Sequence, residues 1–168
     1  MENIELNSPL NSFKQTSGSV QFDGKDLILT GESASYSDYI EVDVSKTLFY
    51  DITYSNTSGS RFLIGFERYD ENKTITSNRG CIYVKVSIYK EDHKRITGTL
   101  TLSNINGNVC KFTKIRILNC WTNSTVEDGV GKIHSFHFIQ ISGDGNSEID
   151  KQGKFTTGWF MEDELLQS

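Results

Sequence analysis

The stretch of residues 39–70 constrains the fold most, because its apolar side chains recur at every second position. It contains three alternating runs, which begin at Ile40, Leu48 and Phe62. A period of two places successive side chains on opposite faces of an extended chain, so each run predicts a half-buried β-strand. The polar residues 55–60 separate the second run from the third, and a short polar loop between alternating runs favours antiparallel pairing.

The same pattern continues along most of the chain. Asp23-Gly24 is a dipeptide typical of a two-residue hairpin turn. In residues 82–88, aliphatic side chains alternate with polar and aromatic ones, which predicts a strand with one wholly aliphatic face. Roughly eight to ten such strands, separated by turn residues, indicate an all-β fold, an antiparallel β-sandwich.

The length of 168 residues predicts a single domain, which we place at residues 13–142 between two short arms. Residues 1–12 form the predicted N-terminal arm, and residues 143–168 form the predicted C-terminal docking arm. The C-terminal arm either packs back on its own domain or is covered by a neighbouring subunit, because its apolar cluster needs a site of burial. Its candidate docking residues are Phe155, Trp159, Phe160, Met161, Leu165 and Leu166.

Charge and composition exclude several classes of protein. The net charge of −5 argues against a nucleic-acid partner, which requires a basic surface to neutralise phosphates. No run of about 18 apolar residues occurs, so we expect no membrane partner. The N-terminal residues lack the basic and apolar parts of a secretory signal, and the three cysteines lack CxxC spacing. We therefore expect free thiols and synthesis in a reducing cytoplasm.

The residues that most often carry catalysis show no catalytic pattern. His134 and His137 are three residues apart on a predicted strand, so we expect them to point to opposite faces and to share no metal ion. His93 lies in a charged turn, where we expect it to be exposed. No serine or cysteine has the local sequence of a nucleophile, and no acid pair can be recognised, so we predict that the chain is not an enzyme.

Aromatic side chains on the predicted strands suggest a different kind of site. Sugars are bound by aromatic planes together with side chains that can form hydrogen bonds to hydroxyl groups. Aromatic residues on strands also commonly serve only to pack the sheet, so that interpretation stays open for each of them. The candidate glycan-binding residues are Tyr36, Tyr39, Tyr83, Tyr89, Trp121 and Asn119.

Four segments of the chain together resemble a known family. They are YIEVDVSKT at residues 39–47, FERYDENK at 66–73, TKIRILNCW at 113–121, and the closing strand at 131–142. Their order and their turns are similar to those of jelly-roll modules related to carbohydrate-binding families 4 and 9, as found in bacteriophage structural proteins. The resemblance covers about residues 20–142, and it implies a jelly-roll form of the predicted sandwich.

The resemblance also raises the question of a metal ion. Related glycan-binding jelly rolls often hold a structural calcium ion between the first and last strands, but the predicted last strand lacks the acidic residue expected there. Asp144, Asn146 and Glu148 alternate like the start of a calcium loop, although Ile149 stands where an EF-hand requires glycine. We therefore expect no cofactor and leave a structural calcium ion as an open alternative.

The predicted function follows from the resemblance and from the lack of catalytic motifs. We predict a non-enzymatic structural protein of a phage virion, made in the host cytoplasm, such as a capsid decoration, head-fibre attachment or tail component. It would dock through its arms onto other virion proteins, with homo-oligomerisation as a further alternative. The alternative function is a glycan-binding adhesion module.

Overall fold

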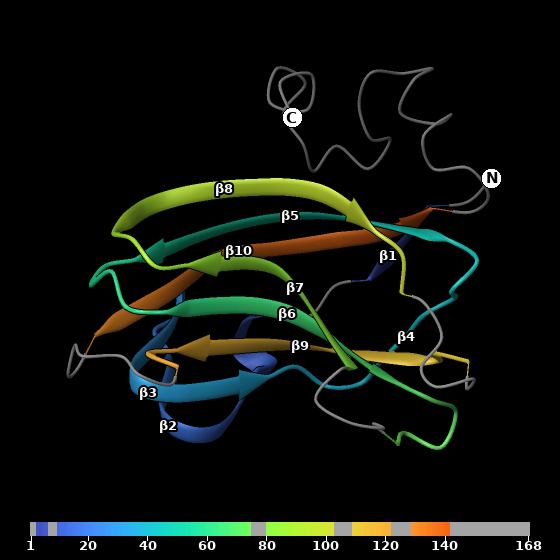
Figure 1. Ribbon diagram of the computed structural model, residues 1–168, viewed down its shortest axis with the longest axis horizontal. Coiled ribbons are helices and arrows are strands. Elements are labelled where there is room, and N and C mark those ends of the chain that lie inside the picture. Colours follow the sequence, from blue (N-terminus) through green and yellow to red (C-terminus); the bar gives the residue numbers. More distant parts are fainter. Residues whose placement is uncertain (1–2, 7–9, 75–79, 103–108, 122–128, 142–168) are drawn as a thin grey trace.

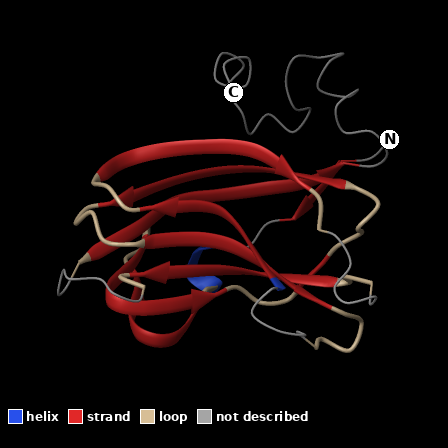
Figure 2. Ribbon diagram, in the orientation of Figure 1, coloured by secondary structure: helices blue, strands red, loops and turns tan. Residues whose placement is uncertain are grey.

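A computed structural model describes residues 3–6, 10–74, 80–102, 109–121 and 129–141 of the chain. This part is almost entirely β-structure, which confirms the predicted fold class (Figure 2). No helix of the described residues is long and apolar enough to cross a membrane. The elements are β1 (Asn3–Leu6), the 3₁₀ turn η1 (Leu10–Ser12), β2 (Lys14–Phe22), β3 (Leu27–Tyr36), β4 (Ile40–Glu41), β5 (Thr47–Asn56), β6 (Phe62–Tyr69), β7 (Cys81–Ser87), β8 (Glu91–Leu100), β9 (Phe112–Asn119) and β10 (Val130–Ile141).

The strands form one antiparallel sheet that folds over on itself into two layers (Figure 1). The strand order is β7-β6-β9-β3-β10-β5-β8, and we call β8, β5 and β10 layer A, and β7, β6, β9 and β3 layer B. Strand β3 connects the two layers, because residues 27–30 pair with β10 whereas residues 33–36 pair with β9. Strand β2 pairs with β3, β4 with β9, and β1 with β10.

Aromatic side chains from the two layers meet in the core. The ring of Phe66 on β6 lies 6.0 Å from that of Phe136 and 5.7 Å from that of Phe138, both on β10. Tyr54 on β5 stacks on Phe62 of β6 at 5.8 Å. Burial of one such ring is worth about 1.5–3 kcal/mol, so these contacts between layers supply much of the force that closes the sandwich.

A β-bulge changes which side chains of β7 face the core. Ile64 of β6 pairs with Lys85, but the next residue, Gly65, pairs with Tyr83. Because directly opposed residues share a face, this shift breaks the regular alternation along β7. Val86 is therefore 52% exposed, and the prediction of one wholly aliphatic face over residues 82–88 is wrong beyond its first half.

The predicted arms are only partly described. Residues 3–6 of the N-terminal arm form β1, which pairs with β10 from Ile141 to Phe138. The C-terminal arm at residues 143–168, with all its candidate docking residues, lies outside the described residues. Cys81, Cys110 and Cys120 are free thiols, and two of them are buried.

Candidate functional site

The outer face of layer B carries a cluster of aromatic and cationic side chains. Strand β9 shows why they point outward: Ile115 and Ile117 are buried in the core, so the alternating Lys114 and Arg116 lie on the opposite face. We call this surface the aromatic–cationic face. Its members are Tyr36, Tyr39, Tyr69, Lys73, Tyr83, Phe112, Lys114, Arg116 and Trp121.

Tyr39 lies at the centre of one half of this face. Its ring meets Tyr69 edge-on at 5.1 Å and Phe112 at 6.1 Å, and it remains 38% exposed. Two ammonium groups lie over this ring, Lys114 Nζ at 4.2 Å and Lys73 Nζ at 5.0 Å from its centre. Such distances are those of cation–π contacts, which hold a lysine in place and leave its N–H groups able to donate to a ligand.

Arg116 organises the other half of the face. Its guanidinium carbon lies 5.7 Å from the ring centre of Tyr36 and 5.5 Å from that of Trp121. Its Nη1 donates a hydrogen bond of 3.1 Å to the hydroxyl of Tyr83. Burial alone would lower the pKa of Arg116, but the surrounding tyrosines and Glu67 raise it above its usual value, so the side chain stays charged.

A buried carboxylate lies beneath these residues. Glu67 is 5% exposed, accepts a hydrogen bond of 2.8 Å from the Tyr69 hydroxyl, and lies 3.4 Å from Arg116 Nε. Burial raises the pKa of Tyr69, and the hydrogen bond to Glu67 raises it further. Burial likewise raises the pKa of Tyr83, to about 12. At neutral pH these hydroxyls therefore remain protonated and able to donate hydrogen bonds.

The aromatic–cationic face collects four of the six candidate glycan-binding residues, namely Tyr36, Tyr39, Tyr83 and Trp121. Tyr89 is 72% exposed but lies in the turn between β7 and β8, and it takes no part in the ring contacts of this face. Five further members of the face were not predicted from the sequence, namely Tyr69, Phe112, Lys73, Lys114 and Arg116. The alternation of residues 112–118 could have placed three of these five on the outer face.

The sixth candidate, Asn119, is buried and does not lie on this face. Its side chain is 0% exposed, and Nδ2 lies 3.2, 2.9 and 2.8 Å from the carbonyl oxygens of Leu29, Gly31 and Gly129. It points into the sandwich, on the same side of β9 as Ile117. Its assignment to a glycan-binding surface is therefore not supported by its position.

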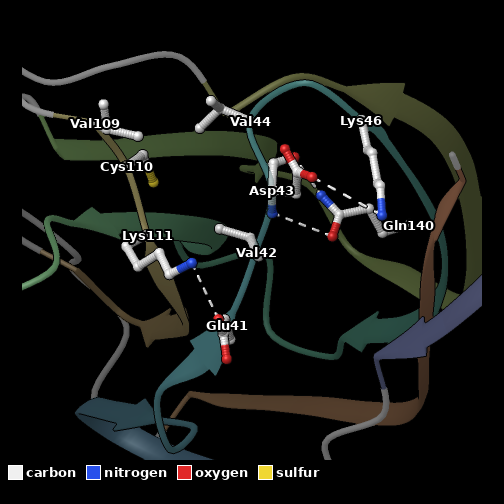
Figure 3. A pocket seen from close by; sticks show the side chains of 9 residues that line it. All are labelled: Glu41, Val42, Asp43, Val44, Lys46, Val109, Cys110, Lys111 and Gln140. Carbon is white, nitrogen blue, oxygen red and sulfur yellow. Dashed lines mark hydrogen bonds and ion pairs between the residues drawn. The ribbon is translucent and has the colours of Figure 1, made fainter. Parts of the chain in front are cut away.

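A hollow of about 560 Å³ lies near the end of β4 (Figure 3). Its polar groups already bind one another: Lys111 Nζ lies 3.1 Å from Glu41, and Gln140 accepts a hydrogen bond of 3.2 Å from the backbone nitrogen of Asp43. Lys46 Nζ is 3.9 Å from the Asp43 carboxylate. These mutual contacts leave few polar groups aimed at a ligand, so we place the candidate site on the aromatic–cationic face.

The histidines are arranged differently from the prediction. A bulge in β10 between Ile133 and Ser135 inserts one residue, and both His134 and His137 lie on the outer face of layer A. The expectation that they point to opposite faces is wrong, because regular alternation stops at the bulge. His134 instead stacks on the exposed His93, with ring centres 3.8 Å apart and an interplanar angle of 6°.

His134 also takes part in a serine–histidine–aspartate arrangement. Its Nε2 lies 2.7 Å from Ser55 Oγ, and its Nδ1 lies 3.0 Å from Asp26 Oδ1, although that second contact lacks the geometry of a hydrogen bond. Ser55 is only 1% exposed, and its Oγ accepts a hydrogen bond of 2.9 Å from the His93 backbone. The hydroxyl thus holds β5, β8 and β10 together rather than facing an open surface.

A site for a metal ion was the remaining possibility raised by the sequence. Among the residues that the structure describes, no three histidine, cysteine or acidic side chains are grouped closely enough to hold a metal ion. The candidates Asp144, Asn146 and Glu148 lie outside the described residues.

Comparison with known proteins identifies the fold but no family. No family model matches the chain, and no curated protein matches it. The CBM22-1 xylan-binding domain of Paenibacillus barcinonensis Xyn10C is similar in structure, with a TM-score of 0.51 at 10% identity, over 84% of this chain and 94% of that domain. The CBM22-1–GH10 modules of Clostridium thermocellum xylanase 10B, complexed with xylohexaose, give a TM-score of 0.53 at 8% identity, over 84% of this chain.

Part of a phage protein has a similar fold. The enzymatically active domain of tailspike protein 4 from bacteriophage CBA120 gives a TM-score of 0.55 at 10% identity, over 80% of this chain. The chain spans only 20% of that tailspike domain and 28% of the xylanase modules. The fold is like that of carbohydrate-binding modules. At these identities the similarity concerns the fold alone.

Proposed function

We propose that the chain is a carbohydrate-binding module and that its glycan lies on the aromatic–cationic face. The observation that carries this proposal is the cluster of rings and cations around the exposed Tyr39. Aromatic rings offer contact to the C–H groups of a sugar, while lysine, arginine and tyrosine side chains donate hydrogen bonds to its oxygens. The fold likeness to two CBM22 structures supports the same proposal.

The test is glycan-array screening followed by isothermal titration calorimetry with the best ligand. We expect Tyr39→Ala to weaken binding at least about tenfold, because the ring positions both lysines and supplies the exposed apolar surface. The matched control is Tyr89→Ala, which removes an exposed tyrosine that takes no part in these contacts and should bind like the wild type. Unchanged binding by Tyr39→Ala, with loss in Tyr89→Ala, would place the site elsewhere.

We further propose that the module binds its glycan without transforming it. Ser55, His134 and Asp26 are the arrangement closest to a hydrolytic triad among the described residues, but the Ser55 hydroxyl is buried and already accepts a backbone hydrogen bond. We expect no labelling of Ser55 by a fluorophosphonate probe and no hydrolysis of the bound glycan. Labelling that disappears in Ser55→Ala would show that the chain is a hydrolase.

A second proposal concerns the setting of the module, and the likeness to a phage tailspike domain supports it. We propose that the module belongs to a virion, is made in the host cytoplasm and is attached to other virion proteins through residues 143–168. Deletion of residues 156–168 should prevent incorporation into particles while the thermal unfolding of the isolated chain stays cooperative. Normal incorporation of the truncated chain would refute the proposed attachment.

A further inference from the structure

The charges on the aromatic–cationic face point to the chemical class of its ligand. We infer that the glycan is anionic and presents a carboxylate or a sulfate to Lys73 and Lys114, an inference that rests on the proposed function. This goes beyond a sugar-binding surface, because a neutral glycan would need no unneutralised cations.

Lys73 and Lys114 are among the lysines of the described chain that form no ion pair with a carboxylate, and both lie over aromatic rings. Four other lysines do form such ion pairs: Lys14 lies 2.8 Å from Asp38, Lys111 lies 3.1 Å from Glu41, and Lys46 and Lys85 lie within 4.0 Å of Asp43 and Glu91, respectively. The ammonium groups of the two lysines lie over rings, and a ring attracts an ammonium group without neutralising its charge.

The carboxylates near the face do not cancel this positive charge. Glu67 is buried, and it already accepts the Tyr69 hydroxyl and faces Arg116. Asp38 is exposed, but Lys14 forms an ion pair with it and is the main cause of its lowered pKa, with Lys114 contributing less. The aromatic–cationic face thus has three cationic members, Lys73, Lys114 and Arg116, and no acidic member, on a chain whose net charge is −5.

The same contacts disfavour a neutral sugar. Stacking of a neutral pyranose on these rings competes with the cations that already lie within 6 Å of the ring centres of Tyr36, Tyr39 and Trp121, although part of the Tyr39 ring remains open to C–H contact. A neutral sugar would have to displace these cations. An anion meets the ammonium groups from the solvent side, and the rings then hold the lysines in the positions that an acidic group requires.

The experiment measures affinity for four probes: a galacturonate hexasaccharide, a heparin-derived hexasaccharide, xylohexaose and a single-stranded DNA oligonucleotide. The first carries carboxylates alone and the second carries sulfates as well as carboxylates, so tighter binding of the second at equal length would indicate recognition of sulfate. We expect one of them to bind at least about tenfold more tightly than xylohexaose, with affinity that falls as salt rises. The double variant Lys73→Gln/Lys114→Gln should lose about five- to tenfold in that affinity and none in thermal stability.

The control is Lys111→Gln, which removes a lysine already paired with Glu41 and should bind like the wild type. Equal or tighter binding of xylohexaose, unaffected by the double variant, would overturn the inference and leave the proposed function standing. Binding of no saccharide would refute the proposed function itself. Binding of the DNA as tight as that of the acidic sugars would show that the face recognises negative charge in general, which also overturns the inference.

Discussion

Replacement of Asn119 should destabilise the fold without altering ligand recognition on the aromatic–cationic face. Three carbonyl oxygens lie within hydrogen-bond distance of Asn119 Nδ2, which carries only two hydrogens, so at most two full hydrogen bonds form at once. At about 0.5–1.5 kcal/mol each, Asn119→Ala should lower the free energy of unfolding by about 1–3 kcal/mol. The hydrogen bonds lost are those that link β9 to β3 and to Gly129, just before β10.

The assay is urea denaturation monitored by circular dichroism, with Asn72→Ala as the control because Asn72 lies in an exposed turn. With a slope of about 1–3 kcal/mol per molar urea, the midpoint of Asn119→Ala should fall by on the order of 1 M at unchanged slope. Glycan affinity, measured under conditions where the variant is folded, should equal that of the wild type. A wild-type midpoint combined with lost glycan binding would refute the reasoning and return Asn119 to the binding surface.

Two further predictions concern packing and pH. Gly131→Ala should destabilise the chain by about 1–3 kcal/mol, because a Cβ there would clash with the buried Phe62 ring. Gly98→Ala should cost less in the same thermal melts, since the half-buried Tyr50 can move aside. Burial raises the pKa of Glu91, but hydrogen bonds from Ser87 and Tyr54 outweigh it and hold the pKa below 4.5. Glu91 therefore stabilises the fold above pH 4.5 and loses this effect as pH falls through its folded pKa, so Glu91→Gln should show a shallower loss of stability in acid unfolding. An equally steep loss in that variant would contradict the argument.

The alternation of side chains was sufficient to predict the sheet and much of its core. Leu48, Ile52 and Tyr54 were placed on one face of a strand by their spacing, and all three are buried together. The bulges in β6–β7 and β10 could not be predicted, because they depend on how neighbouring strands align rather than on local sequence. The errors at Val86 and at the histidines both follow from those shifts in register.

The candidate site was predictable in part. The aromatic residues were recognised by type, and the fold brings four of them onto one surface, but residue type alone cannot show which face of a strand a side chain occupies. Counting alternate positions from the apolar Ile115 and Ile117 would have placed Lys114 outside and Asn119 inside. The position of Lys73 over Tyr39 depends on a turn that packs against the start of β9, and no pattern within the sequence indicates that contact.

The most direct test of the account is a two-dimensional ¹H–¹⁵N NMR titration of the labelled chain with the glycan that binds best on the array. We expect the glycan to change the chemical shifts of the backbone amides of Tyr39, Lys73, Lys114 and Arg116. Residues that line the hollow of Figure 3, such as Val42 and Gln140, should show no comparable change. Shifts centred on the hollow or on the outer face of layer A, with the aromatic–cationic face unchanged, would contradict the assignment of the glycan to that face.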